Sequence, residues 1–380
     1  MGKNGNGEGS TYEHKRNGKK VGYRGCYTVH TADGPKRRYV TGRTREEVRQ
    51  KLTKAIAERD GGFVFNAETL ELEKYLRQWL SSSVRDTVSI RTYERYEQIC
   101  RIHLIPALGH MKLKNLSPAH ARALYRQKLD NGLSPRTVEY IHTTLHKALK
   151  QAVMDGLIPR NVTDAVKAPR GTKNEIHPLT LEEVQALLKA AHGDRLEALY
   201  LLAVTAGLRE GELLGLKWED IDFTIGTLSV RRTLSQTKQK GPILKSTKNS
   251  KGRNVKLTPI VLDALRKHKA AQNAGRLNLG TLWKEHGLIF PGPTGKPMHP
   301  WVLYKGSFKR LLAQAGIEKQ VRFHDLRHTC ATLLIGKNIH AKIVQELLGH
   351  STITTTLNTY SHVLPTMQDQ AAEAMESIVT

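Results

Sequence analysis

The chain contains 380 residues, of which 39% are apolar, so it is long enough for two or three domains and too apolar to be disordered throughout. The sequence contains 60 Lys and Arg residues and 35 Asp and Glu residues, which gives a formal net charge of +25 at pH 7. This excess favours a polyanionic partner, such as nucleic acid or an anionic membrane surface, over a small neutral metabolite.

The apolar stretches and the cysteines bear on the compartment in which the protein works. The longest strongly apolar stretch, 198–208, is shorter than the roughly 20 residues that a membrane helix needs, and the glycine-rich start lacks the apolar core of a signal peptide. Cys26, Cys100 and Cys330 are too few and too scattered for a disulfide framework or a multi-thiolate zinc site. We therefore expect a soluble, unexported protein in a reducing cytoplasm.

The N-terminal part divides into a polar tail and a small basic module. Residues 1–11 are glycine-rich and almost free of apolar side chains, which predicts a disordered tail. In residues 12–62, two segments rich in Tyr, Val and Thr (21–29 and 36–40) flank an Asp-Gly turn, and a capping box at Thr44 begins a helix. We expect a ββ(β)α module here.

Many side chains of this module are cationic, and a sheet can present such side chains to phosphates. The alternative is a solvated face without a partner. The residues of the module that we assign to nucleic-acid contact are Lys19, Lys20, Arg24, Arg37 and Arg38.

Residues 66–166 carry apolar side chains at helical spacing, which predicts a compact bundle of about four helices. Ser117 and Ser134 each precede a proline, a pattern typical of a helix that begins with a capping hydroxyl. The cationic side chains at exposed positions either face nucleic acid or only keep the bundle soluble. We assign Arg91, Arg95 and Lys147 to nucleic-acid contact.

Residues 167–176 have the composition of a linker, and their positive charge, including that of Arg170, suits contact with a phosphate backbone. Residues 177–380 alternate helices with a short β patch at 227–231 and 254–257, which predicts a mixed α+β domain with a C-terminal tail. Glycine-rich loops for nucleotide phosphates are not found, so a nucleotide cofactor is not expected. The expected fold class is multi-domain and mainly α, with small β elements.

Unusual polar residues gather in four places of the last segment. They are Thr-Ala-Gly-Leu-Arg-Glu-Gly-Glu at 205–212, Thr-Lys-Asn-Ser-Lys-Gly-Arg at 247–253, His-Asp-Leu-Arg-His at 324–328, and Leu-Leu-Gly-His at 347–350, with Tyr360 ten residues after the last histidine. Together these motifs resemble those of the tyrosine recombinases, whereas each motif alone would be a weak signal.

The resemblance extends over most of the chain. Residues 177–365 closely resemble the catalytic domain of this family, and 66–166 look like its core-site-binding domain. Residues 12–62 look like the arm-site-binding module of phage and transposon integrases. The resemblance implies a C-shaped clamp on duplex DNA and four protomers that act together.

Cleavage of a phosphodiester without a metal requires a nucleophile, cations for the charge on the non-bridging oxygens, and an acid for the leaving oxygen. We assign Tyr360, in a polar stretch after a predicted helix, as the nucleophile. A phenol, with a pKa of about 10, needs a base or a strong positive potential to react. Arg209 and Arg327 would form the phosphate clamp, because a guanidinium offers a planar fork of donors and stays charged.

The resemblance implies further roles around this clamp. His324 and His350 would donate hydrogen bonds to the scissile phosphate, and His324 would also accept the proton of the nucleophile. Lys248 is the candidate general acid, because the family carries such a lysine in a β turn. Glu212 looks like the carboxylate that orients the cations, with a plain helix salt bridge as the alternative. His328 lies four residues after His324, so we expect it to support or pack against the site.

Several alternatives remain open from the sequence. Lys245 and Lys251 lie close enough to Lys248 to replace it as the acid. The two histidines of 324–328 have the spacing of a zinc-protease helix, but Arg327 between them would repel a metal. The same site would also serve a type IB topoisomerase, and a non-catalytic architectural DNA-binding protein is the second alternative.

We therefore expect a site-specific DNA recombinase, an integrase, that forms a 3′-phosphotyrosyl link and a Holliday junction without a metal or another cofactor. The expected partners are double-stranded attachment sites of core and arm type and further copies of the chain in a tetramer. Accessory directionality or DNA-bending proteins are additional candidates, and a membrane is not expected. The expected location is the bacterial cytoplasm, on the nucleoid. The C-terminal tail would pack on its own domain or on a neighbouring protomer.

Overall fold

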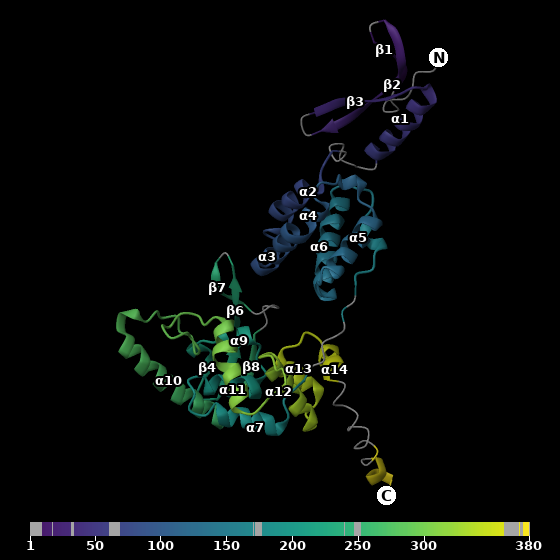
Figure 1. Cartoon of the computed structure of the whole chain (residues 1–380). Coiled ribbons are helices and arrows are strands. Elements are labelled where there is room, and N and C mark those ends of the chain that lie inside the picture. Colours follow the sequence, from purple (N-terminus) through teal and green to yellow (C-terminus); the bar gives the residue numbers. More distant parts are fainter. Residues whose placement is uncertain are drawn as a thin grey trace. The chain divides into compact units, whose positions relative to one another are not determined.

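The computed structural model contains two compact units, Met1–Thr172 and Lys173–Thr380 (Figure 1). The residues that it describes are 10–16, 18–31, 34–60, 69–169, 171, 177–238, 240–246, 252–360, 372 and 375–379. Lys248, Arg170 and most of the tail after Tyr360 lie outside these residues. Within them the chain is mainly helical with small antiparallel sheets, which confirms the predicted fold class.

The N-terminal module is a three-stranded antiparallel sheet with one helix. Its elements are β1 (Ser10–Arg16), β2 (Lys19–Thr31), β3 (Gly34–Gly42) and α1 (Arg45–Asp60), and the strand order is β1-β2-β3. Tyr27, Val48 and Leu52 are buried between the sheet and the helix. Gly25 allows this close approach, because a Cβ there would lie 3.0 Å from Val48.

The expected disordered tail at 1–11 is wrong for its last two residues, and residues 1–9 lie outside the described residues. Ser10 and Thr11 already belong to β1, where they pair with Cys26 and Gly25 of β2. The hydrogen bonds of the strand ladder, rather than apolar burial, offset the entropy lost when these polar residues are ordered.

The rest of the first unit is a helical bundle, as the apolar spacing predicts. Its helices are α2 (Leu72–Gln78), α3 (Ile90–Ile99), α4 (Ile105–Leu108), α5 (Pro118–Asp130) and α6 (Pro135–Met154), with π turns at Trp79–Val84 and Cys100–Leu104 and 3-10 turns at Leu113–Asn115 and Val162–Ala165. Ser134 Oγ accepts a hydrogen bond from the backbone N of Thr137 at 3.2 Å. Ser117 Oγ accepts one from His120 at 3.5 Å. Both predicted caps are therefore confirmed.

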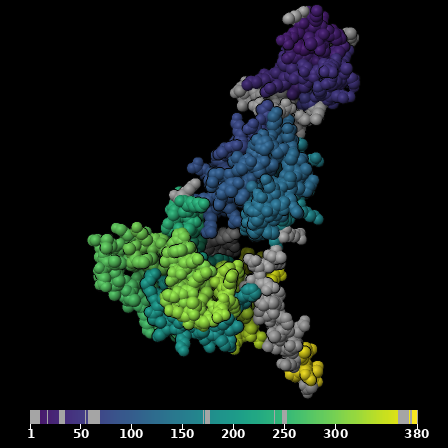
Figure 2. Space-filling view, viewed as in Figure 1, coloured from purple at the N-terminus to yellow at the C-terminus, as the bar shows by residue number. Residues whose placement is uncertain are grey.

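The second unit carries the four motifs. Its helices are α7 (Leu181–Ala190), α8 (Glu197–Ala206), α9 (Glu210–Leu214), α10 (Pro259–Leu279), α11 (Lys309–Gln314), α12 (Asp325–Gly336), α13 (Ala341–Leu348) and α14 (Ile353–Tyr360), with 3-10 turns at Trp218–Asp220 and Gly280–Leu282 and a π turn at Val302–Phe308. In the space-filling view, α10 (green) lies at one edge of this unit (Figure 2). Among the described residues, no helix combines the length and the hydropathy that spanning a membrane requires.

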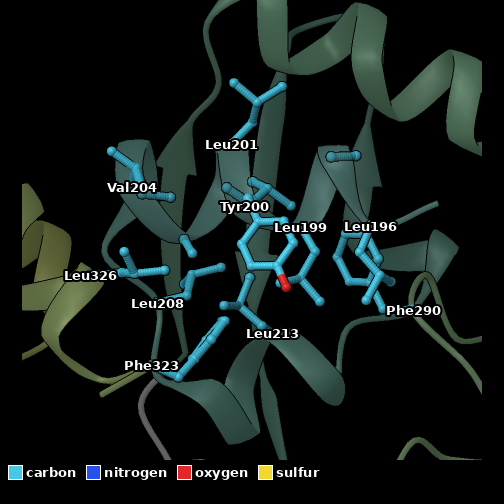
Figure 3. Close-up of a cluster of buried hydrophobic side chains, with 14 of the residues drawn as sticks. Leu196, Leu199, Tyr200, Leu201, Val204, Leu208, Leu213, Phe290, Phe323 and Leu326 are labelled. Atoms are coloured by element: carbon cyan, nitrogen blue, oxygen red, sulfur yellow. The ribbon is translucent and has the colours of Figure 1, made fainter. Parts of the chain in front are cut away.

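The core of the second unit is built around α8. Figure 3 shows side chains of this helix, such as Leu199 and Val204, together with Phe290 and Phe323 from distant segments, gathered around Tyr200. The Tyr200 hydroxyl donates a hydrogen bond to Ser307 Oγ at 2.7 Å, so this buried oxygen is paired. Because α8 is apolar on all sides, the core encloses it and fixes the position of the loop that follows.

The strands of the second unit are β4 (Ile221–Asp222), β5 (Thr227–Val230), β6 (Arg232–Thr237), β7 (Gly241–Ser246) and β8 (Arg253–Lys256). The pairing of β5 with β8 confirms the predicted β patch. β6 and β7 form a separate two-stranded ribbon that the sequence did not predict. β6 is mostly polar, and β7 contains Pro242, which is tolerated because each strand of a two-stranded ribbon is an edge strand.

Candidate active site

Tyr360 is the last residue of α14 and is almost completely buried, with 1% of its surface exposed. Its hydroxyl lies 2.9 Å from Nδ1 of His328. Its ring belongs to an apolar cluster that includes Ala331 and Leu348. Burial raises the pKa of Tyr360 to about 12, against the opposing charge of Arg327, so the phenol is neutral in this arrangement.

The segment that leads to Tyr360 is helical, contrary to the expectation that the tyrosine lies in a polar stretch after a helix. A run of threonines disfavours helix by propensity, which explains the error. In the structure, Thr359 Oγ1 donates to the carbonyl of Thr355 at 2.7 Å, and Thr356 is fully buried. Packing of α14 on α13 therefore outweighs propensity and holds the tyrosine in the interior.

Arg209 lies between α8 and α9. α8 ends at Gly207, whose φ of +57° favours glycine and whose Cβ, if present, would lie 2.6 Å from Leu348. Arg209 is the N-cap of α9, and its backbone N and its Nη1 donate to Glu212 at 3.0 and 2.7 Å. Its Nη2 donates to the Gly349 carbonyl at 3.3 Å. The loop thus brings the first motif against the last one.

Glu212 lies in the middle of this charged cluster and is only 3% exposed. Its Oε2 contacts Nη2 of Arg253, from β8, at 2.7 Å. Burial alone would raise the pKa of Glu212, but the hydrogen bonds and charges of Arg253 and Arg209 outweigh burial and hold that pKa at about 2. Glu212 is therefore an ionised carboxylate shared by two arginines, which goes beyond a salt bridge within one helix.

Arg327 is also buried, with 2% of its surface exposed. Its Nη1 donates to the carbonyl of Gly207 at 2.8 Å, and its Nη2 has no partner among the described residues. Burial, together with the charge of Arg209, lowers the pKa of Arg327 to about 10, so it remains cationic at neutral pH. A buried donor on a charged group is costly without a partner, and a phosphate oxygen would provide one.

Three histidines complete the cluster, and burial is the main cause of a lowered pKa in each. The pKa falls to about 4 for His328 and His350, and it is also lowered for His324. His350 Nδ1 lies 2.9 Å from Thr356 Oγ1, which leaves Nε2 for another partner. The rings of His324 and His328 meet edge to face with centroids 5.2 Å apart. His328, rather than His324, contacts the phenol of Tyr360.

The cluster as a whole combines a buried phenol, held by a neutral imidazole and under the charge of Arg327, with further guanidinium and imidazole groups. Such donors can neutralise a phosphate and bind the charge that grows on its oxygens during substitution. Among the described residues, no three His, Cys, Asp or Glu side chains are placed to share a metal ion.

The predicted contact residues of the N-terminal sheet lie in different environments. Lys20 forms an ion pair with Glu13 at 2.7 Å. Arg24 stacks on Tyr39, with Cζ 4.1 Å from the ring centre, on the sheet face opposite the buried Tyr27. The remaining candidates here are exposed: Lys19, Arg37 and Arg38.

In the helical bundle, two of the predicted contact residues are held by tyrosines. Arg95 lies over Tyr140, with Cζ 3.4 Å from the ring centre. Lys147 donates to the hydroxyl of Tyr96 at 2.6 Å. Arg91 is exposed.

Two family models match the chain: the phage integrase family over residues 177–367, and the N-terminal SAM-like domain of phage integrases over residues 71–129. A tyrosine recombinase XerC-like protein of Caldanaerobacter subterraneus subsp. tengcongensis is 30% identical across 96% of this chain and 97% of its own length. The chain belongs to the phage integrase family of tyrosine recombinases. An integrase of Saccharopolyspora erythraea is a further relative, 28% identical over 90% of each chain. The predicted enzyme class, a tyrosine-type site-specific recombinase, is thereby confirmed.

This recombinase is also similar in fold to solved structures. The Tn1549 transposon integrase in complex with a circular intermediate DNA has a TM-score of 0.67 at 23% identity and covers 82% of this chain and 100% of its own. A lambda integrase tetramer bound to a Holliday junction has a TM-score of 0.55 at 23% identity, with 90% and 96% covered.

Two residues in the site of this recombinase were not singled out from its sequence. Arg253 is the last residue of the motif at 247–253, in which only the lysines were considered as catalytic groups. Thr356, which contacts His350, lies among several neighbouring threonines, and nothing in the sequence distinguishes it from them. The available signal for Arg253 was a cation at the start of a predicted strand, which is too common to be decisive.

Proposed function

We propose that this enzyme cuts and rejoins DNA at attachment sites to integrate or excise a mobile element, with Tyr360 as the nucleophile. The observation that supports this most strongly is the buried Nη2 of Arg327, which has no partner among the described residues and lies within the charge influence of Arg209 and Tyr360. A scissile phosphate would pair that donor and would lie between the two guanidinium groups. His324 and His350 would donate further hydrogen bonds to it.

In the proposed reaction, Tyr360 Oη forms a bond to the scissile phosphorus, and the bond from phosphorus to the 5′ oxygen breaks. The phenol proton passes to His324, and the 5′ oxygen receives a proton from Lys248. The products are a 3′-phosphotyrosyl link and a free 5′-hydroxyl. Because the link conserves a phosphodiester bond, the 5′-hydroxyl of a partner strand can attack it, and successive exchanges pass through a Holliday junction.

The arrangement of Tyr360 in the free protein is proposed to be a resting one. A neutral phenol bonded to His328 in an apolar cluster is a poor nucleophile. The charge of Arg327 lowers the pKa of the same phenol, so closer contact with the cationic cluster would favour the phenolate. Attack therefore requires Tyr360 to leave His328 for the phosphate.

We also propose that four copies act together on two duplexes in the bacterial cytoplasm, on the nucleoid. The fold shared with the lambda integrase tetramer on a Holliday junction and the charge of +25 support this. Residues 12–62 would bind arm-type sites and 66–166 core-type sites, ahead of a catalytic domain at 177–380. The proposed DNA contacts are Lys19, Lys20, Arg24, Arg37, Arg38, Arg91, Arg95, Lys147 and Arg170. Accessory directionality or DNA-bending proteins remain candidate partners.

The test is denaturing gel electrophoresis after incubation with nicked suicide duplexes, which trap the covalent product. The duplexes carry candidate attachment DNA from the junctions of the host element, and the buffer contains EDTA. Wild type, Tyr360→Phe and Tyr304→Phe are compared, the last as a matched removal of one hydroxyl from a tyrosine that packs on Phe308 in the same unit. We expect an adduct with wild type and Tyr304→Phe and none with Tyr360→Phe.

An adduct that persists in Tyr360→Phe would contradict the assignment of the nucleophile. Absence of any adduct on duplexes that the protein demonstrably binds would contradict the proposed chemistry. A second assay with two labelled duplexes then separates recombination from relaxation: a recombinase joins strands of different duplexes, whereas a topoisomerase rejoins the strand that it cut.

A further inference from the structure

Arg253 joins two parts of the candidate active site that are far apart in the sequence. It is the first residue of β8, and its side chain is only 14% exposed. Its Nη2 and Nη1 contact Oε2 and Oε1 of Glu212 at 2.7 and 3.3 Å. Its Nε donates to the carbonyl of Leu347, at the end of α13, at 2.8 Å. One guanidinium therefore connects α9, β8 and α13.

Each group that Arg253 contacts is bonded to, or close in sequence to, a residue that we assign to phosphate binding. Glu212 uses the same two oxygens to hold the side chain and the backbone of Arg209. Leu347 lies three residues before His350, and Arg209 itself reaches the intervening Gly349 carbonyl at 3.3 Å. Arg253 thus closes a ring of contacts that runs from Arg209 through Glu212 to the loop that carries His350.

The loop is shaped to receive this side chain. Gly349 ends α13 with a φ of +67°, and a Cβ at this position would lie 3.0 Å from Nη1 of Arg253. A glycine is favoured here for two reasons: it adopts the left-handed conformation easily, and it has no Cβ that would collide with the guanidinium of Arg253.

Arg232 provides a contrast within the same unit. Its side chain, 19% exposed, also bridges acidic groups, with Nη1 3.0 Å from Asp220 and Nη2 2.8 Å from Glu219. Among the described residues, none of its hydrogen bonds reaches Arg209, His350 or Tyr360. Arg232 thus forms partly buried ion pairs similar to that of Arg253 with Glu212, but it is not connected to the candidate active site.

We propose that Arg253 is a positioning residue of the recombinase. It acts through Glu212 and the Leu347 carbonyl to fix the placement of Arg209 relative to His350 around the scissile phosphate. This inference rests on the proposed function, because it presumes that Arg209 and His350 bind that phosphate. A lysine cannot reproduce the effect, since one ammonium cannot serve a carboxylate and a carbonyl in the fork geometry of a guanidinium.

The test compares Arg253→Lys with Arg232→Lys and wild type in single-turnover formation of the covalent adduct, at saturating full-length protein on a suicide duplex. The plateau of the reaction counts correctly folded molecules, whereas the rate constant reports the geometry of those that react. We expect Arg253→Lys to lower the rate constant about tenfold or more, because small misplacements of catalytic groups are costly. DNA affinity in a mobility-shift titration and the rate constant of Arg232→Lys should stay within about twofold of wild type.

A reduced plateau with an unchanged rate constant in Arg253→Lys would show a merely structural role and overturn the inference. Glu212→Gln and the double variant supply a second readout. Because Arg253 acts partly through Glu212, the double variant should lose less than the product of the two single losses, whereas fully multiplied losses would contradict that route. Absence of an adduct in wild type would overturn the proposed function and this inference with it, so the two failures are distinguishable.

Discussion

The hydroxyl of Tyr360 lies 2.9 Å from Nδ1 of His328, although the two residues are 32 positions apart in the chain. Both groups are neutral at pH 7, because burial raises the pKa of Tyr360 to about 12 and lowers that of His328 to about 4. A neutral phenol and a neutral imidazole share one hydrogen bond and carry no net charge. The contact therefore holds the phenol in place without activating it.

The first prediction separates the roles of His324 and His328. His324→Gln should lower the single-turnover rate of adduct formation about 100-fold or more, as expected for loss of a general base. His328→Gln retains a hydrogen-bonding amide near Tyr360 and should cost less than about tenfold. Rates on a suicide duplex at saturating protein provide the measurement. The reverse order of the two effects would make His328 the base.

The second prediction concerns the buried guanidinium of Arg327. Arg327→Lys should lower the adduct rate about 100-fold or more, because the fork of donors is lost. Its free energy of unfolding should change by less than about 1 kcal/mol, since one of the two terminal nitrogens has no partner to lose within the part of the chain that the structure describes. Urea denaturation and adduct assays measure the two effects. Arg322→Lys, at an exposed arginine that pairs with Asp325, is the control that should leave the rate unchanged.

The third prediction is a loss of stability in mild acid. An unperturbed histidine takes up a proton near pH 6.5, whereas folded His328 and His350 do so only near pH 4. Between these values the unfolded chain binds more protons, so the free energy of unfolding should fall as pH decreases from 6.5 to 4. Glu212 adds a further loss below its ordinary pKa of 4.5, as pH approaches its folded pKa of about 2.

Urea denaturation of the protein at a series of pH values measures this effect. His350→Gln removes one titrating group and should make the decline between pH 6.5 and 4 less steep. His192→Gln, at an exposed histidine, is the control. A slope that is identical in wild type and His350→Gln would contradict the prediction.

The fourth prediction tests the turn that presents Arg209. Gly207→Ala should destabilise the protein by roughly 2–5 kcal/mol, since it combines a left-handed backbone with a collision against Leu348. Gly193→Ala is a matched control, because Gly193 also has a positive φ but has open space around it. It should cost only the backbone penalty of roughly 1–2 kcal/mol. Equal losses in the two variants would show that the contact with Leu348 contributes nothing.

Much of this fold follows from local signals that the sequence displays directly. The capping box of Thr180 and Glu183, for example, forms at α7 with both hydrogen bonds, at 2.7 and 3.2 Å. Such signals involve residues three or four positions apart, so a single stretch of sequence contains all the information. The motifs likewise indicated Arg209, Glu212 and Arg327, which the structure brings into one cluster.

The contacts that could not be predicted all depend on how distant elements pack. Arg253 reaches Leu347 across 94 positions, and nothing near Arg253 indicates this partner. The burial of Tyr360 depends on the packing of α14, whose threonines argue against a helix when read alone. In the ribbon of β6 and β7, Leu234 is the only large apolar residue of β6 and the apolar residues of β7, Ile243 and Leu244, are adjacent, so neither strand shows the apolar alternation by which strands are recognised.

The guanidinium groups of Arg209 and Arg253 both contact the carboxylate of Glu212, and the charges of these two arginines and of Glu212 act on the buried Arg327. The free protein therefore holds three cations around one carboxylate, an excess of positive charge in and beside its interior. A ligand that binds only the folded state raises its stability, and a phosphate would also relieve this imbalance. We therefore expect DNA to stabilise the fold as well as to serve as substrate, so that the thermal midpoint of the second unit reports site occupancy even in a variant that cannot cut.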